Sequence, residues 1–228
     1  MSAFEAAWAR AEPVGGWLTH DQGRALWQAA HQVPAGGRIL EIGSHQGRST
    51  IVLACAAREA GAKVLAVDPF IAGGVFGGAG TRDLFAANID AAGLTDVVRL
   101  IPEKSTALRP NWQEPLAMLF VDGKHDYWTV RDDLRWTRHL PAGAPVLVHD
   151  AFSSIGVTLA LLIHVLPGTQ LRYLGREGSL ARFETRPPSA RDRLRMLAEL
   201  PWFARNITIK IALRLARLTG YRRTPDPY

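Results

Sequence analysis

Apolar residues recur at two spacings along this chain, and the two spacings alternate. Short continuous apolar runs, typical of strands buried on both faces of a parallel sheet, occupy residues 38–42, 63–68, 97–101, 116–122 and 144–150. Apolar residues at helical spacing occupy residues 20–32, 48–60, 81–92, 127–140 and 157–166. Residues 170–175 and 180–185 flank a polar turn and predict a hairpin. The pattern predicts an α/β fold with a doubly wound parallel sheet that ends in an antiparallel hairpin.

The order of these elements also predicts how the chain is organised. Residues 1–37 read as an N-terminal helical extension with two helices. Residues 38–186 carry all the predicted strands and form the main domain, and residues 187–228 read as a basic helical extension that is broken near Pro201. A length of 228 residues suits one α/β domain with such extensions. A glycine-rich stretch at residues 69–80 follows the second strand, and we expect it to form a lid or a disordered loop.

Charge is distributed unevenly between these regions. Residues 1–181 hold 16 Lys and Arg against 17 Asp and Glu, whereas residues 182–228 hold 11 against 4. The excess positive charge therefore belongs to the C-terminal extension. Three interpretations remain open: the extension packs on the domain or on a second subunit, lies on an anionic membrane surface, or binds nucleic acid. No aromatic-interleaved RNA motif accompanies the charge, so nucleic acid is the weakest of the three, and we expect a homo-oligomer, most simply a dimer.

Composition excludes several classes of protein. No apolar run approaches the roughly 20 residues of a membrane span. The first residues lack the basic and apolar regions of a signal peptide. A single cysteine, Cys55, excludes an internal disulfide and fits a reducing compartment. We therefore expect a cytoplasmic protein.

The loop after the first strand carries the clearest chemical pattern. Gly43 and Gly47 lie between that strand and the following helix, and Glu41 precedes them. A phosphate-binding loop would need a lysine after the second glycine, and a dinucleotide loop would need a third glycine; neither is present. Asp68 ends the next strand, about 20 residues further on, where an acid can accept hydrogen bonds from ribose hydroxyls. An acid at Glu41 would repel a pyrophosphate and attract a cation, which favours S-adenosylmethionine.

Four segments together resemble a known family. "LEIGSHQGRST", "AVDPF", "LFVDGKHDYWTVRDDL" and "PVLVHDA" are similar to the motifs of class I S-adenosylmethionine-dependent methyltransferases, with their Rossmann-like sheet. The branch with macrocin-type and other sugar O-methyltransferases is the most similar, including the type that methylates the mycobacterial methylmannose polysaccharide. The resemblance implies that glycines admit the cofactor, that Asp68 holds its ribose and that Ser105 lies beside its adenine. The implied cofactor-binding residues are Glu41, Gly43, Ser44, Gly47, Ser49, Asp68, Ser105 and Asp122.

Acids and histidines follow the fourth and fifth strands. Asp122 and His125 come after the fourth strand, and His149 and Asp150 come after the fifth. Because neighbouring parallel strands end at one crevice, we expect these four side chains to converge. A divalent cation there would lower the pKa of a bound hydroxyl, and a histidine could take the proton.

The resemblance assigns roles within this cluster. An Asp-x-x-His motif, matched by Asp122 and His125, supplies a magnesium ligand and the catalytic base in the related sugar methyltransferases. A paired acidic motif supplies further ligands, and here only Asp150 matches because His149 replaces an acid. The implied metal ligands are thus Asp122, His149 and Asp150. A nitrogen ligand would favour Mn²⁺ over Mg²⁺, or His149 is instead a second catalytic base.

The sequence therefore predicts an S-adenosylmethionine-dependent O-methyltransferase that uses Mg²⁺ or Mn²⁺. We expect its acceptor to be a sugar hydroxyl, on an oligosaccharide such as a mannoside or on a glycosylated small molecule, with a role in polysaccharide biosynthesis. One alternative is a metal-independent O-methyltransferase with a histidine base. Alternatives from other classes are an NAD-binding oxidoreductase, which the missing third glycine disfavours, and a non-catalytic membrane- or RNA-associated module on the same fold.

Overall fold

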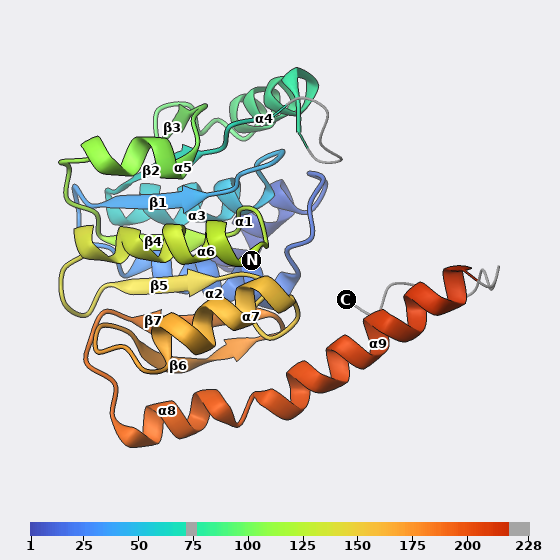
Figure 1. Ribbon diagram of the computed structural model, residues 1–228. Helices are drawn as coiled ribbons and strands as arrows, with labels where there is room; N and C mark the ends of the chain where they lie inside the picture. Colours follow the sequence, from blue (N-terminus) through green and yellow to red (C-terminus); the bar gives the residue numbers. More distant parts are fainter. Residues whose placement is uncertain (72–76, 219–228) are drawn as a thin grey trace.

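The computed structural model describes residues 1–71 and 77–218 (Figure 1). Part of the glycine-rich stretch predicted to form a lid, residues 72–76, lies outside the described residues, so the lid stays a prediction.

A mixed seven-stranded sheet forms the centre of the protein, in the order β3-β2-β1-β4-β5-β7-β6. Strands β1 to β5 are parallel, and β7 runs antiparallel between β5 and β6. The strands are β1 (Arg38–Ile42), β2 (Lys63–Val67), β3 (Val98–Ile101), β4 (Met118–Val121), β5 (Pro145–Val148), β6 (Arg172–Glu177) and β7 (Leu180–Glu184). The predicted fold class and terminal hairpin are confirmed.

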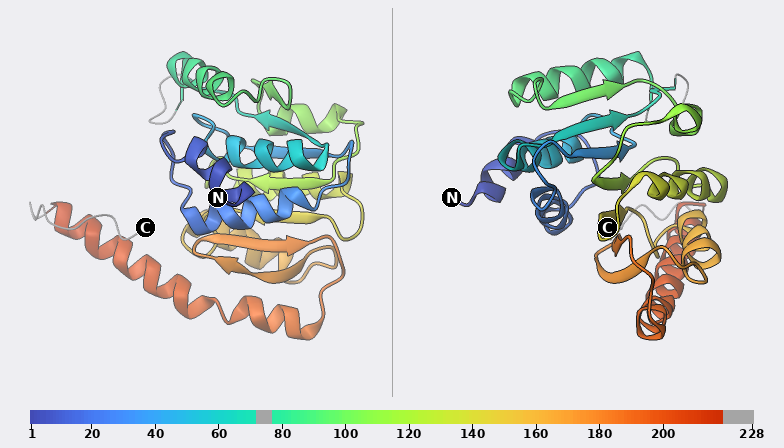
Figure 2. Two further views of the ribbon diagram at one scale, coloured as in Figure 1. Left: turned by 180° about the vertical axis from the view of Figure 1, so that it is seen from behind. Right: turned by 90° about the vertical axis from the view of Figure 1, so that its left-hand side faces the viewer.

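Helices cover both faces of the sheet (Figure 2). α1, α2 and α3 pack together on one face, and α5, α6 and α7 cover the other. The helices around the sheet are α1 (Ala3–Ala11), α2 (His20–His31), α3 (Arg48–Ala60), α4 (Ala79–Ala91), α5 (Ser105–Leu108), α6 (Tyr127–Asp133) and α7 (Ile155–Ala160). Short 3₁₀ turns at Arg109–Asn111 and Leu134–His139 follow α5 and α6, and a π turn at Leu161–Val165 follows α7.

The strands divide their side chains between two hydrophobic cores. Ile39 and Phe120 pack in the core beneath α1, α2 and α3, whereas Leu40 and Leu119 pack in the core beneath α6 and α7. Successive strand residues point to opposite faces, so a continuous apolar run is needed to fill both cores. This is why these strands lack the polar alternation of a sheet that is exposed on one face.

Strand register brings the predicted site to one edge of the sheet. Ile42, the last residue of β1, pairs with Val67 of β2 and with Val121 of β4, and Val121 pairs with Val148 of β5. β1 and β4 are adjacent although other elements separate them in the chain, so the crossover direction reverses here and opens a crevice. The residues that follow these four strand ends are Gly43, Asp68, Asp122 and His149.

One predicted helix differs in the structure. The apolar spacing over residues 127–140 predicts a single α-helix, but the α-helix ends at Asp133 and a 3₁₀ helix continues to His139. The tighter winding places Leu134, Trp136 and Thr137 in the interior, where the indole of Trp136 meets that of Trp112 edge-on at 5.4 Å. The spacing therefore predicted burial correctly and the helix type wrongly.

Two helices follow the hairpin. α8 (Ala190–Leu197) and α9 (Leu200–Leu218) are separated at Ala198 and Glu199, close to the break predicted near Pro201. Within the described residues, no helix has both the length and the apolar character that a membrane span needs.

Candidate active site

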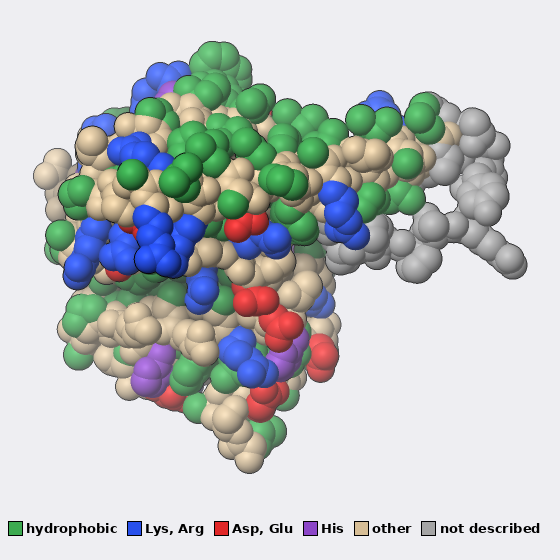
Figure 3. All heavy atoms as spheres, turned by 90° about the horizontal axis from the view of Figure 1, so that it is seen from below, with side chains coloured by type: hydrophobic (Ala, Val, Ile, Leu, Met, Phe, Trp, Pro, Cys, Tyr) green, Lys and Arg blue, Asp and Glu red, His purple; other side chains and the backbone are tan. Residues whose placement is uncertain are grey.

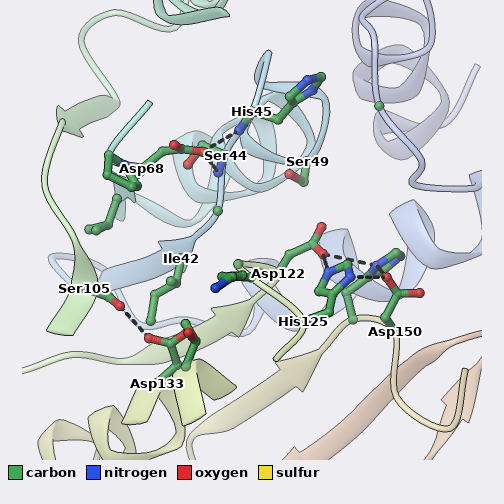
Figure 4. Close-up of a pocket in the computed structure, with 18 of the residues that line it drawn as sticks. Ile42, Ser44, His45, Ser49, Asp68, Ser105, Asp122, His125, Asp133 and Asp150 are labelled. Atoms are coloured by element: carbon green, nitrogen blue, oxygen red, sulfur yellow. Dashed lines mark hydrogen bonds and ion pairs between the residues drawn. The ribbon is translucent and has the colours of Figure 1, made fainter. Parts of the chain in front are cut away.

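A cavity of about 860 Å³ opens where β1, β2, β4 and β5 end. Its walls come from the loops that follow these strands, from residues 15–18 and from the start of α5. A volume of this size accommodates a nucleoside-sized ligand together with a second small molecule. Figure 4 shows Asp68, Ser44 and His45 on one side, Ser105 and Asp133 on another, and Asp122, His125 and Asp150 together on a third.

Asp68 fixes the loop between β1 and α3. One of its carboxylate oxygens accepts hydrogen bonds from the backbone N–H groups of Ser44 and His45, each at 3.0 Å, and the other accepts from the N–H of Phe70 at 2.9 Å. His45 has a left-handed backbone, with a φ of 46°. A carboxylate has about four acceptor positions, so Asp68 can hold this loop and still accept a ribose hydroxyl. Its predicted ribose contact stays a prediction.

The two glycines of this loop meet different demands. Gly43 has a φ of 89°, and a Cβ there would collide with the backbone carbonyl of Asp122, so only glycine lets the ends of β1 and β4 approach so closely. Gly47, with a φ of 97°, is the N-cap of α3 and lacks a side-chain cap. The first N–H groups of α3 therefore lie beside the cavity without a capping side chain.

Glu41 lies behind the cavity wall rather than on it. Its side chain is fully buried, and its two oxygens accept hydrogen bonds from the hydroxyls of Ser49 at 2.6 Å and Thr50 at 2.5 Å. Burial raises the pKa of Glu41 to about 7, although these hydroxyl groups oppose the shift. Ser49 itself lines the cavity, so any effect of Glu41 on a ligand passes through Ser49. Its predicted direct cofactor contact stays a prediction.

Asp133 is a site residue that the sequence did not indicate. Ser105 donates a 2.5 Å hydrogen bond to Oδ1 of Asp133, and Oδ2 has no hydrogen-bond partner in the described part of the chain. Burial raises the pKa of Asp133 to about 7. Both residues line the cavity, so a buried acceptor faces the place predicted for the adenine. Its position within a run of charged residues on α6 resembles that of a solvated side chain, which is why it was missed.

The predicted acid–histidine cluster assembles. His149 Nδ1 lies 3.2 Å from Asp122 Oδ1 and 3.8 Å from Asp150 Oδ2. His125 Nδ1 lies 3.1 Å from Asp150 Oδ2, and His125 Nε2 lies 3.7 Å from Asp122 Oδ1. Two carboxylates and two imidazoles thus alternate around one point at the ends of β4 and β5 (Figure 4).

These pairings shift the pKa of every member. Burial by itself would lower the pKa of His149, but the Asp122 and Asp150 carboxylates outweigh it and raise that pKa to about 10. The same carboxylates raise the pKa of His125 above its usual range against the effect of burial. In return the imidazoles hold the pKa of Asp122 and of Asp150 below their usual range, although burial favours the neutral acids. At neutral pH His149 is therefore a cation.

The two histidines differ in exposure. The His149 side chain is 6% exposed, whereas that of His125 is 43% exposed. His125 can therefore meet an acceptor that enters the cavity, whereas His149 lies at the buried end of the cluster.

Gln22 of α2 holds His149 from behind. The N–H of Thr19 donates to Gln22 Oε1 at 3.1 Å, which fixes that atom as an acceptor, and Gln22 Nε2 donates to Ser179 Oγ at 3.1 Å. His149 Nε2 lies 3.2 Å from Gln22 Oε1 and must therefore carry a proton and donate it. The ring is thereby oriented with Nδ1 toward Asp122. Sequence reasoning missed Gln22, which lies 127 residues from His149.

Two carboxylates and an imidazole nitrogen are suitable donors for Mn²⁺ and, less so, for Mg²⁺. The residues that the structure describes nevertheless contain no group of three or more His, Cys, Asp or Glu side chains arranged to hold a metal ion. Each carboxylate of the cluster is directed toward an imidazole instead. This arrangement does not fit a metal centre, and the predicted metal ligands Asp122, His149 and Asp150 stay a prediction.

Comparison with known proteins agrees with this fold. Residues 40–151 match the model of a family described as a methyltransferase domain. This segment begins in β1 and ends just after Asp150, so it contains both the glycine loop and the acid–histidine cluster. The match confirms the predicted enzyme class at the level of a methyltransferase and disfavours the NAD-binding alternative.

Solved structures share the fold, and two of the three described here are of O-methyltransferases. The O-methyltransferase NovP superposes with a TM-score of 0.62 and 18% identity, over 75% of this chain and 83% of NovP. TomG from Streptomyces achromogenes, an O-methyltransferase involved in tomaymycin synthesis and solved with SAM, gives 0.55 and 18% identity, over 83% and 91%. Cofactor-bound Rv0187 from MTB gives 0.57 and 21% identity, over 80% and 87%.

Proposed function

We propose that this protein transfers the methyl group of S-adenosylmethionine to a hydroxyl of a small acceptor, with His125 as the general base. The observation that carries the proposal is the position of His125 at the cavity, half-exposed and held between two carboxylates. The family match, the O-methyltransferases with the same fold and the glycine loop support it.

The cavity suits this cofactor in two respects. Glycine at position 43 keeps the loop close to β4, and Asp68 and the start of α3 offer hydrogen-bonding groups beside it. Asp133 Oδ2 is an unsatisfied buried acceptor, and an exocyclic amino group such as that of adenine would satisfy it. S-adenosylmethionine, when bound, supplies an electrophilic methyl group on a positively charged sulfur.

His125 performs the proton transfer in this proposal. Asp150 accepts a hydrogen bond from Nδ1, and Nε2, which lies 3.7 Å from Asp122 Oδ1, takes the proton of the acceptor hydroxyl. S-adenosylmethionine, held beside Asp68 and the start of α3, would supply the methyl group to the acceptor oxygen, and its sulfur would keep the electron pair of the broken carbon–sulfur bond. Asp122 and Asp150 stabilise the imidazolium that results, and the His149 cation keeps both carboxylates ionised.

The acceptor proposed from the sequence is a sugar, either on an oligosaccharide such as a mannoside or on a glycosylated small molecule. Trp17 supports this choice, because its indole is 61% exposed, lines the cavity and lies 5.2 Å from the His45 ring. Flat aromatic surfaces suit the apolar faces of sugar rings.

The metal-dependent form of the reaction is the second candidate, supported by the donor types in the cluster and opposed by their present pairing. Transfer of labelled methyl from S-adenosylmethionine to a panel of mannosides, other oligosaccharides and non-sugar hydroxyl compounds tests both. We expect product with a sugar, and unchanged turnover in EDTA supports the histidine-only form. Loss of turnover in EDTA with recovery in Mg²⁺ or Mn²⁺ would instead establish the metal. Absence of transfer to any hydroxyl would overturn the proposed function.

A further inference from the structure

The last two helices present an unusual outward surface. On α8 the exposed residues Ala190, Leu194 and Leu197 follow one another at helical spacing, and the exposed Arg191 lies beside them. Arg193 on the other side is turned toward the domain, where its guanidinium donates to the backbone carbonyls of Leu166 and Gly168. Leu194 is 65% exposed, whereas Met196 on the opposite side of α8 is buried. A helix in contact with water usually presents polar residues at such positions.

α9 repeats this arrangement. Its outward face carries Ala204, Thr208 and Ile211 at spacings of four and three residues, and Ile211 is 55% exposed. Arg205 and Arg214 border this face on its two sides, and both are exposed. Neither arginine forms an ion pair within the described residues, so neither charge is neutralised by a neighbouring side chain. Figure 3 shows hydrophobic side chains along α8 and α9 with Lys and Arg groups beside them.

Side chains from the first part and the middle of α9 fix it to the domain. Asn206 donates to the backbone carbonyl of Phe152, and Lys210 donates to that of Ser153. Arg176 stacks on Trp202 at 3.8 Å and pairs with Glu199 at 2.6 Å. From there α9 runs past the edge of the sheet at which β1, β2, β4 and β5 end (Figures 1 and 2). A helix of 19 residues is about 28 Å long, and the later part of α9 projects beyond the body of the protein (Figure 1).

Charge decides between the partners that could cover this surface. A second copy of the chain that used the same surface would bring the arginines of both copies together, because a two-fold interface pairs a patch with itself. A nucleic acid would neutralise the arginines but leave Leu194 and Ile211 in water. An anionic bilayer meets both demands, since its headgroups attract the arginines and its interfacial region accepts the apolar side chains.

We infer that α8 and α9 form a docking surface for an anionic lipid bilayer, defined by Leu194, Leu197 and Ile211 and by Arg191, Arg205 and Arg214. Docking is peripheral, with the helices in the plane of the interface. The contacts of α9 with Phe152 and Ser153 join this surface to the loop that begins at Asp150. The bilayer therefore lies beside the sheet edge at which the cavity opens. This inference is independent of the proposed methyl transfer.

Flotation of the full chain with liposomes tests the inference. The probe is vesicles of phosphatidylcholine with about one third phosphatidylglycerol, compared with vesicles of phosphatidylcholine alone. We expect binding to the anionic vesicles and little to the neutral ones, and we expect it to weaken at high salt because screening reduces the attraction of the arginines.

Matched variants separate the two components of the surface. The double variant Arg205→Gln/Arg214→Gln should weaken anionic-vesicle binding by roughly 25-fold, about fivefold for each charge near the surface. Ile211→Ser should weaken it several-fold at unchanged charge. The control Arg82→Gln/Arg138→Gln removes two exposed arginines from elsewhere on the protein and should bind like the wild type. Circular dichroism of each variant establishes that it is folded.

Three results would overturn the inference. The first is failure of the wild type to float with anionic vesicles at low salt. The second is binding that falls with the arginine variant but not with Ile211→Ser, because it would show attraction without apolar contact. The third is a wild-type protein that binds no vesicles but forms a concentration-dependent dimer or a complex with RNA. Loss of that dimer or complex in Ile211→Ser or in the arginine variant would assign the surface to the other partner. Each result leaves the methyl-transfer assay of the domain unaffected.

Discussion

The two sides of the cavity are held in place by different interactions. On the cofactor side, Asp68 binds backbone N–H groups of the loop after β1, and Gly43 lets that loop lie against β4. On the acceptor side, side chains hold one another: His125 and His149 pair with Asp122 and Asp150 at 3.1–3.8 Å.

Because of this difference, cofactor binding and methyl transfer should respond to different substitutions. A loop held by backbone hydrogen bonds keeps its shape when a single acceptor-side residue changes. A cluster of ionised side chains is instead sensitive to each neighbour, because each charge sets the pKa of the next. We therefore expect substitutions on the cofactor side to change cofactor affinity and substitutions on the acceptor side to change the rate.

The largest effect is expected from His125→Ala. A general base contributes about 10²–10⁴-fold in rate, so kcat should fall by that factor. The dissociation constant of S-adenosylmethionine, measured by calorimetry, should stay nearly unchanged because His125 pairs with Asp122 and Asp150, whereas Asp68 holds the loop after β1. Comparable losses in affinity and in kcat would contradict the separation of the two sides.

Asp68→Ala should produce the opposite result. It removes charge-assisted hydrogen bonds worth roughly 1.5–3 kcal/mol, or about a ten- to hundredfold loss of affinity for S-adenosylmethionine. At saturating cofactor, kcat should remain within a few-fold of wild type. Asp68→Asn keeps one carbonyl acceptor and should lose less. An unchanged dissociation constant in Asp68→Ala would exclude the ribose contact predicted from the sequence.

A smaller effect is expected from Gln22→Leu, which removes the acceptor of the His149 Nε2–H while nearly keeping the side-chain volume. The change also removes the acceptor of the Thr19 N–H and the donor to Ser179 Oγ. Because each unmade buried hydrogen bond costs about 1–3 kcal/mol, urea denaturation should show a loss of at least that order. Turnover should fall up to about tenfold, and the NMR signal of the His149 Nε2–H should shift or disappear. Gln22→Glu keeps an acceptor and should retain that signal. Gln32→Leu, an exposed position just after α2, is the control and should behave like wild type.

The strands and the acids that follow them could be predicted from the sequence, for identifiable reasons. Continuous apolar runs marked the parallel strands, and the position of each acid after such a run marked one edge of the sheet. Asp122, His125, His149 and Asp150 were therefore expected to meet, and they do. Local chain geometry determines these features, and local geometry is what a sequence pattern records.

Other features depend on packing between distant segments. Glu41 precedes the glycine loop as expected, yet the hydroxyls of α3 enclose it behind the cavity wall. Asp133 is buried in the cavity wall against Ser105 of α5, and Gln22 reaches His149 from α2, which packs beside α3 on one face of the sheet. No periodicity or spacing encodes these contacts, since they arise only when the elements pack together.

The pH dependence of methyl transfer tests the central claim, that His125 deprotonates the acceptor, most directly. His125 acts as a base only when it is neutral, so the rate at saturating cofactor should rise with pH. The midpoint should lie above the usual histidine pKa of about 6.5, because Asp122 and Asp150 raise the pKa of His125. His149→Ala removes a cation that lowers the pKa of His125. In this variant the rate of methyl transfer should therefore still rise with pH, but at higher pH than in the wild type. In His125→Ala the rise should be absent. A rise that persists in His125→Ala and disappears in His149→Ala would contradict the account and make His149 the base.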